Sequence, residues 1–236
     1  MGTTRTDLHR LSAHVLGRRR YAVSGHFGLR ASPDGLATPA FGPEPETLRL
    51  TSTRLIRETG THSSSVSLQG TTLDELARFA GADLASAYSA GANTPGLGPT
   101  TEPLHLSPDE LAPIFAWFVL GWRVLDTVVS ELPAQWTQST VQLWPEHFDV
   151  GTGLDFGRGD GDGVNLGFSA GDAYSDEPYA YVGPGGPDRP GDAAFWNVPF
   201  GALRRRSDVK AASGEPAVVA AAFIREGLAR LDKEDA

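Results

Sequence analysis

The chain contains no cysteine among its 236 residues. Disulfide bridges, thiolate nucleophiles and zinc sites built from cysteine are therefore excluded. It contains six histidines, and all of them precede Ser169. Any site that needs an imidazole after Ser169 in the chain is excluded as well.

Long apolar runs are also missing. A membrane-spanning helix needs roughly 18 or more consecutive apolar residues. The nearest stretch, 114–129, is interrupted by Gly121, Arg123 and Asp126. The N-terminus lacks the apolar core of a signal peptide. We therefore expect a buried helix rather than a membrane contact, and a cytoplasmic protein.

Positively charged residues are fewer than negatively charged ones. The formal net charge is −9 at pH 7, which disfavours a surface that binds phosphate groups, so no nucleic-acid partner is expected. The basic clusters 18–20 and 204–206 are exceptions. Each lies at the edge of a structured run, and we expect both to be solvated.

What is present is an ordinary globular composition, with 40% hydrophobic and 21% charged residues, together with 28 glycines and 17 prolines that imply many turns. Hydrophobic periodicity and capping signals predict helices near 6–20, 72–81, 108–132 and 216–231. Strands are expected within 21–69, as two hairpins (26–32 with 36–41, and 48–57 with 63–69), and within 139–202. Residues 72–75 match a capping box at the start of the helix 72–81.

The predicted strands and helices are segregated along the chain rather than alternating. That order favours an α+β fold, with antiparallel sheet packed on a long central helix and amphipathic helices at both termini. The length permits one large domain covering 1–236. An alternative division gives halves 1–85 and 107–236, joined by the segment 86–106, which is rich in Gly, Pro, Ser and Thr.

The stretch 139–202 holds most of the candidate site residues. If 141–151 and 164–169 pair as a hairpin around 158–163, side chains alternate between its two faces. Trp144, Phe148, Val150, Val164, Leu166 and Phe168 then share an apolar face, and His147, Asp149, Asn165 and Ser169 share a polar one. The polar face is either a cleft or plain solvent-facing surface.

Residues 167–171 read Gly-Phe-Ser-Ala-Gly, which matches the G-x-S-x-G elbow of serine hydrolases. That elbow needs a helix after the serine and a histidine later in the chain. A polar loop follows Ser169, and no later histidine exists. We therefore expect that Ser169 is not a nucleophile of the elbow type.

A set of polar and aromatic residues surrounds the predicted hairpin. We take His147, Asp149 and Ser169 as candidate catalytic residues, and Trp144, Glu146, Asp172, Glu177, Tyr179 and Trp196 as candidate ligand-binding residues. Oxygen and imidazole ligands from His147, Asp149 and Asp172 would suit a divalent metal. We expect a site without metal, the metal-binding set is the alternative, and the sequence names no cofactor.

Three short motifs resemble a pattern found in uncharacterised bacterial domains of unknown function. The segments 143–149 (LWPEHFD), 168–172 (FSAGD) and 177–182 (EPYAYV) are similar to that family's W-P-x-H-F-D strand, S-P-G-D turn and E-P-Y-x-Y strand. Ala170 stands where the pattern has proline. The resemblance marks these positions but implies no particular chemistry.

Three hypotheses on function remain open. The first is a protein that binds a small molecule in a cleft beside the 139–202 sheet. The second is a hydrolase, with His147 as general base or metal ligand and a carboxylate orienting it. In the third, the same residues only hold the sheet of a structural or partner-binding protein.

Overall fold

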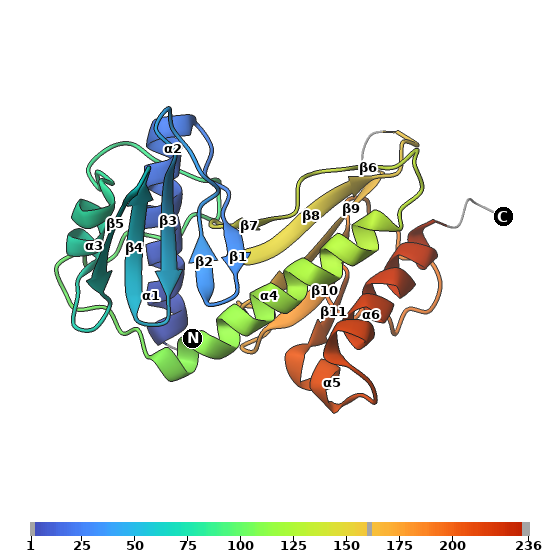
Figure 1. The fold of residues 1–236 in the computed structure, drawn as a ribbon. Coiled ribbons are helices and arrows are strands. Elements are labelled where there is room, and N and C mark those ends of the chain that lie inside the picture. Colours follow the sequence, from blue (N-terminus) through green and yellow to red (C-terminus); the bar gives the residue numbers. More distant parts are fainter. Residues whose placement is uncertain (1–2, 160–161, 233–236) are drawn as a thin grey trace. The chain divides into compact units, whose positions relative to one another are not determined.

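The computed structural model describes residues 3–159 and 162–232 and has an α+β architecture built from antiparallel sheets and helices (Figure 1). The predicted fold class is confirmed at that level. The chain divides into two compact units, one made of Met1–Ala116 and Leu143–Phe148, the other of Trp117–Gln142 and Asp149–Ala236. The boundary lies inside a helix, whereas the segment 86–106 belongs wholly to the first unit.

The first unit consists of a helix at the N-terminus, an antiparallel meander and a short helix. Its elements are α1 (Thr3–Leu11), η1 (Ser12–Gly17), α2 (Arg18–Ser24), β1 (Arg30–Ser32), β2 (Gly35–Ala37), β3 (Glu46–Thr51), β4 (Arg54–Thr59), β5 (His62–Ser67) and α3 (Leu73–Ala80). The strands pair in chain order, β1-β2-β3-β4-β5. The predicted capping box is present at the start of α3, where the Thr72 side chain accepts from the Glu75 N–H.

The predicted strand 48–57 is wrong, because the chain turns in its middle. β3 ends at Thr51 and β4 begins at Arg54, and these two strands pair with each other. The Thr51 hydroxyl oxygen accepts hydrogen bonds from the N–H groups of Thr53 and Arg54. This turn contains neither glycine nor proline, so a threonine side chain closes it without the usual sequence signal.

An amphipathic helix was predicted at the N-terminus, but the middle of the observed helix is buried on all sides. Every residue from Leu11 to Arg18 is buried, including the polar Ser12 and His14. The middle turns, η1, form a π-helix, a rare form that often accompanies functional positions. The Ser12 hydroxyl donates to the Leu8 carbonyl one turn earlier, whereas Arg10, His14 and Arg18 have hydrogen-bond partners far along the chain.

Those partners lie in the segment 83–99, which we call the strap. Arg10, His14 and Arg18, spaced four residues apart on one side of the helix, each donate to strap carbonyl groups. The Arg18 guanidinium reaches the carbonyls of Asp83 and Ser86, at 3.1 and 2.6 Å. The strap is therefore anchored, although its composition predicts a linker. Arg18, 5% exposed, is not the solvated charge that we predicted.

Replacing Arg18 by methionine should free the strap. The change removes charge-assisted hydrogen bonds to two carbonyl groups and should cost about 2 kcal/mol of unfolding free energy. Limited proteolysis should then cut within 83–99 faster than in the original protein. Arg123→Met, at an exposed position of helix α4, is the control. Equal cleavage of the strap in both variants would contradict the anchoring role.

The second unit is an antiparallel sheet with helices on one face. Its elements are most of α4 (Pro108–Ser130), β6 (Thr137–Gln138), β8 (Asp149–Asp155), β9 (Gly163–Ser169), β10 (Tyr179–Pro184), β11 (Ala202–Arg205), α5 (Arg206–Ala211) and α6 (Pro216–Leu231), while β7 (Gln142–Trp144) spans the boundary between the units. The order is β11-β10-β9-β8-β6. The predicted hairpin is present as β8 and β9, but its first strand covers 149–155 instead of the predicted 141–151; residues 160–161 of the predicted turn lie outside the described residues.

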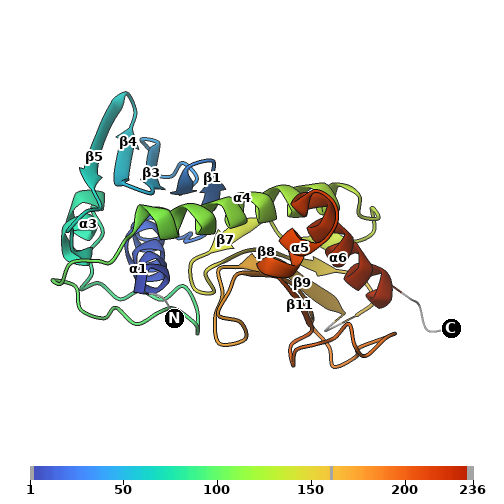
Figure 2. The same ribbon diagram turned by 90° about the horizontal axis from the view of Figure 1, so that it is seen from below.

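Two glycines bring the helices close to this sheet. A side-chain carbon at Gly121 of α4 would lie 2.5 Å from Cγ of Phe168, and one at Gly227 of α6 would lie 2.8 Å from a methyl group of Val182. Phe168 and Val182 are fully buried. Figure 2 shows α4 and α6 on one side of the strands of this sheet. The core of the second unit therefore lies between these helices and the apolar face of β8–β10.

By length and composition alone, α4 is apolar enough to cross a membrane, which the interrupted sequence did not lead us to expect. The core helix of a soluble protein passes the same test. Leu111, Phe118 and Leu125 of α4 have no exposed surface. Within the second unit, the Trp117 ring of α4 packs on Phe168 at 5.2 Å between centroids. This packing is what a core helix provides.

Candidate functional site

The candidate site is the face of the second unit's sheet opposite α4 and α6. Because side chains alternate along a strand, the neighbours of buried Phe168 and Val182 point to that other face. Register places Asp149 opposite Ser169 and Ser169 opposite Tyr179. One row across β8, β9 and β10 therefore carries a carboxylate, a hydroxyl and a phenol.

This row is not plain solvent-facing surface. Asp149 is 6% exposed, Ser169 is 3% exposed and Tyr179 is 3% exposed. Burying polar groups costs free energy unless they are hydrogen-bonded. The contacts of each group therefore decide what the row can do.

Asp149 of β8 accepts a hydrogen bond from the hydroxyl of Tyr181 on β10, two strands away across β9. The Tyr181 ring reaches it by lying over Gly167, where a side-chain carbon would be 2.5 Å from the phenol oxygen. Gly151, the register partner of Gly167, leaves similar room. Burial raises the pKa of Tyr181 well above its ordinary value, and the adjacent Asp149 carboxylate adds to the rise.

A second tyrosine–aspartate pair lies beside the first. The Tyr179 hydroxyl donates to Oδ2 of Asp172 at 2.6 Å. Burial is the main cause that raises the pKa of Tyr179, and the hydrogen bond to Asp172 is the second. Ser169 is held from two sides, since its Oγ accepts from the Gly171 N–H at 3.1 Å and its carbonyl accepts from Nε1 of Trp117 at 2.9 Å. The two phenols stay protonated and direct their protons at carboxylates.

This row holds carboxylate, hydroxyl and phenol groups and no imidazole. The second unit contains no histidine, so a general base there would have to be a carboxylate. In the fully described stretch between Ser169 and β10 the chain forms turns and bends without a helix, as the sequence led us to expect. Ser169 therefore lacks the local structure of a nucleophile elbow.

The structure brings four predicted site residues together: Asp149, Ser169, Asp172 and Tyr179. Glu177 and Trp196 make contacts elsewhere in the second unit. The Glu177 carboxylate accepts from the N–H and hydroxyl of Ser207 at the start of α5. The indole N–H of Trp196 donates to the carbonyl of Pro190 at 3.0 Å.

The predicted strand 141–151 is interrupted, and this changes the position of His147. β7 ends at Trp144, a turn covers residues 145–148, and β8 begins at Asp149. The Phe148 N–H donates to the Trp144 carbonyl at 2.8 Å and Phe148 takes a left-handed φ of 55°. The alternation of side chains between the two faces of a strand is therefore broken at this turn. It does not predict on which face His147 lies relative to Trp144 and Asp149. The Trp144 ring lies 6.2 Å from that of Phe27 in the first unit.

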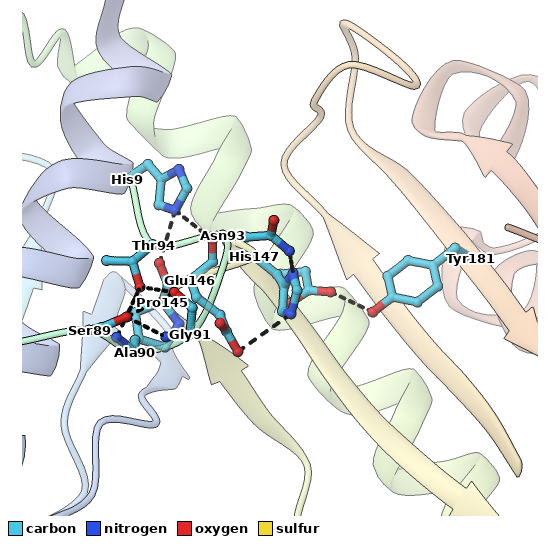
Figure 3. A network of polar contacts seen from close by, with 11 residues as sticks. His9, Ser89, Ala90, Gly91, Asn93, Thr94, Pro145, Glu146, His147 and Tyr181 are labelled. Carbon is cyan, nitrogen blue, oxygen red and sulfur yellow. Dashed lines mark hydrogen bonds and ion pairs between the residues drawn. The ribbon is translucent and has the colours of Figure 1, made fainter. Parts of the chain in front are cut away.

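His147 belongs to the first unit, and its imidazole is exposed between an amide and a carboxylate (Figure 3). Nδ1 lies 3.2 Å from Nδ2 of Asn93, and Nε2 lies 3.5 Å from Oε1 of Glu146. The amide nitrogen Nδ2 can only donate, so Nδ1 accepts and the neutral ring carries its proton on Nε2, toward Glu146. The Glu146 carboxylate itself rests against the backbone of Gly91, where a side-chain carbon would collide with it.

The turn 145–148, which carries His147, is held by His9, a histidine that was not predicted as a site residue. Nε2 of His9 donates to the carbonyls of Pro145 and Glu146, at 2.9 and 3.2 Å, and the ring stacks on Phe148 at 4.9 Å. Burial lowers the pKa of His9 to about 4, although both hydrogen bonds oppose the change. His9 is neutral at pH 7 and acts as a support of the turn.

Tyr181 and His9 were not predicted as site residues. A sequence pattern points to Tyr181, but none points to His9. Tyr181 is two positions from Tyr179 and faces a glycine on the neighbouring strand, a pattern that marks a large side chain lying across a sheet. His9 lies in a helix far from Pro145 in the chain, and no local pattern predicts that contact.

A metal site gains no support from the side-chain arrangement. Across 3–159 and 162–232, no three His, Asp or Glu side chains gather closely enough to hold an ion. The alternative role of His147, Asp149 and Asp172 as a metal-binding set stays a prediction.

Comparisons of the chain with protein-family models, with curated proteins and with solved structures found no match. Function must therefore be inferred from the geometry.

Proposed function

We propose that this is a cytoplasmic protein that binds a small molecule in a cleft beside the sheet of the second unit. The observation that carries the proposal is the pair of tyrosine–aspartate hydrogen bonds flanking Ser169 on the face opposite the helices. A sheet that served only to hold the fold would be expected to bury apolar side chains there. We expect neither nucleic acid nor membrane as partner.

The chemistry of the row suggests the kind of ligand. The protons of Tyr179 and Tyr181 are already directed at Asp172 and Asp149. What the row offers to a ligand is mainly the lone pairs of carboxylate and hydroxyl oxygens. A small ligand rich in N–H or O–H groups fits this supply best, with Asp149 and Ser169 as its principal contacts.

A screen of polyols, amino acids and small amines by thermal shift tests the proposal. We expect at least one compound to raise the melting temperature in a saturable way. Asp149→Asn should weaken its binding about tenfold, as expected for loss of one charge-assisted hydrogen bond. Tyr181→Phe should weaken it as well, because the Asp149 carboxylate then loses the donor that positions it. Asp126→Asn, at an exposed position of α4, should bind like the original protein. Binding that is unchanged in both site variants, or no binding at all, would contradict the proposal.

A hydrolase is the second candidate, and the surroundings of His147 favour it. The exposed imidazole has a carboxylate 3.5 Å from Nε2 as an orienting group, and Nδ1, which now accepts from the Asn93 amide, would be the basic nitrogen once a substrate displaces that amide. Hydrolysis of p-nitrophenyl acetate should then fall to the background rate in His147→Asn. The matched control is His62→Asn on the exposed strand β5. Equal hydrolysis rates in the His147→Asn and His62→Asn proteins would contradict the hydrolase candidate. Ligand binding would then remain as the proposed function.

A further inference from the structure

A separate cavity of about 440 Å³ lies wholly within the first unit. It lies where the start of α1, the turn after β5 and the entry to α4 meet. Its lining residues are Thr4, Leu68, Gln69, Gly70, Leu104, His105, Leu106, Ser107 and Glu110. Its volume is within the range of pockets that hold small molecules.

The lining has an apolar part and a polar part. Leu68 and Leu104 are almost fully buried, at 2% and 6% exposed, and Leu106 is half-buried. The remaining side chains contribute hydroxyl, amide, imidazole and carboxylate groups. Such a lining suits a ligand that has an apolar body and one polar end.

The imidazole of this cavity is oriented by a buried carboxylate behind it. Oδ2 of Asp7 accepts from the backbone N–H of His105 at 2.8 Å and lies 3.5 Å from Nδ1 of the same residue. Oδ1 of Asp7 is held by the Arg10 guanidinium at 2.7 Å. Asp7 is 6% exposed. The His105 side chain is itself 73% exposed, so the Asp7 carboxylate favours one orientation of an imidazole that stays open to solvent.

The charges of the lining select the sign of the ligand. Glu110 is the only acidic side chain in the lining, and neither lysine nor arginine is part of it. An anionic ligand would therefore meet repulsion without a compensating cation, whereas an ammonium group can pair with Glu110. Asp109, the preceding residue, is an acid of the same helical turn that does not line the cavity.

We propose that this cavity binds a small primary amine with an apolar body, such as an alkyl or cycloalkyl amine. The apolar body contacts Leu68, Leu104 and Leu106. The ammonium group lies at the polar part, near Glu110 and His105. The site is independent of the ligand proposed for the second unit.

The test compares three compounds of one shape by saturation-transfer NMR and titration: cyclohexylamine, cyclohexanol and cyclohexanecarboxylate. We expect the amine to bind about fivefold more tightly than the carboxylate, the scale of one exposed ion pair. Backbone amide shifts on adding amine should be confined to 4–7, 68–70 and 104–110. Glu110→Gln should abolish the preference for amine, and Asp109→Asn should retain it.

Several results would overturn the proposal. They are equal binding of amine and carboxylate, a preference that survives Glu110→Gln, or amide shifts outside these segments. Glu110 is exposed, so its substitution leaves the fold intact and the comparison interpretable. Asp149→Asn should leave amine binding here unchanged, which separates this outcome from that of the function proposed for the second unit.

Discussion

Replacing Gly167 by alanine should lower the free energy of unfolding by about 3 kcal/mol. The new methyl group would lie 2.5 Å from the ring of Tyr181, which therefore has to move. Moving the ring breaks the hydrogen bond between its hydroxyl and Asp149 and leaves a buried carboxylate with one donor fewer. Urea denaturation monitored by tryptophan fluorescence measures the loss.

Gly153→Ala is the matched control, because it lies on the same sheet and its new methyl group would approach only side-chain oxygens, the nearest at 3.3 Å. We expect it to change stability little. In a Tyr181→Ala background, the cost of Gly167→Ala should vanish, since the colliding ring is gone. A cost that persists there would show that the glycine is required for the backbone rather than for Tyr181.

Acidification from pH 7 to 4 should destabilise the first unit through His9. The pKa of His9 is lowered from 6.5 to about 4 in the folded state, mainly by burial. Between these values the unfolded chain binds a proton that the folded protein does not, so stability falls as pH decreases from 6.5 and the loss is complete below 4. The loss amounts to about 3 kcal/mol.

His9→Gln should remove most of this pH dependence. Glutamine can still donate to the carbonyl of Pro145 but does not titrate. Urea denaturation at pH 7, 5.5 and 4.5 gives the comparison, with His62→Gln on the exposed strand β5 as control. Burial also lowers the pKa of His14, so part of the acid sensitivity should remain. A His9→Gln protein that follows the original pH curve would contradict the assignment.

The helices and the main hairpin could be predicted from sequence because their signals are local. Thr72 and Glu75 form their capping box within one turn of chain. Pro216 begins α6, as predicted, at a position where a helix needs no N–H from that residue. Alternation of apolar residues in 141–151 and 164–169 predicts that these segments pair and which face of 164–169 is buried, but only 149–151 of the first segment belongs to the observed strand β8.

The candidate site could be predicted only in part. Asp149, Ser169, Asp172 and Tyr179 lie together because the hairpin and the next strand have the register that the alternation indicates. The turn at 145–148 was not predicted, and it separates His147 from that periodicity. The role of Tyr181 depends on the absence of a side chain at Gly167, on a different strand.

The sequence by itself determined the fold class, most helix limits and the two faces of the second sheet, because each depends on residues a few positions apart. Only the tertiary structure decided which polar residues are buried. Arg18 lies in a basic cluster that predicts solvation, yet it is buried because carbonyl groups 65 and 68 positions later accept hydrogen bonds from its guanidinium. His9 likewise depends on the carbonyl of Pro145. Whether a charged or polar side chain such as Arg18 or His9 is buried depends on hydrogen-bond partners that are distant in the sequence. A local sequence pattern does not predict those partners.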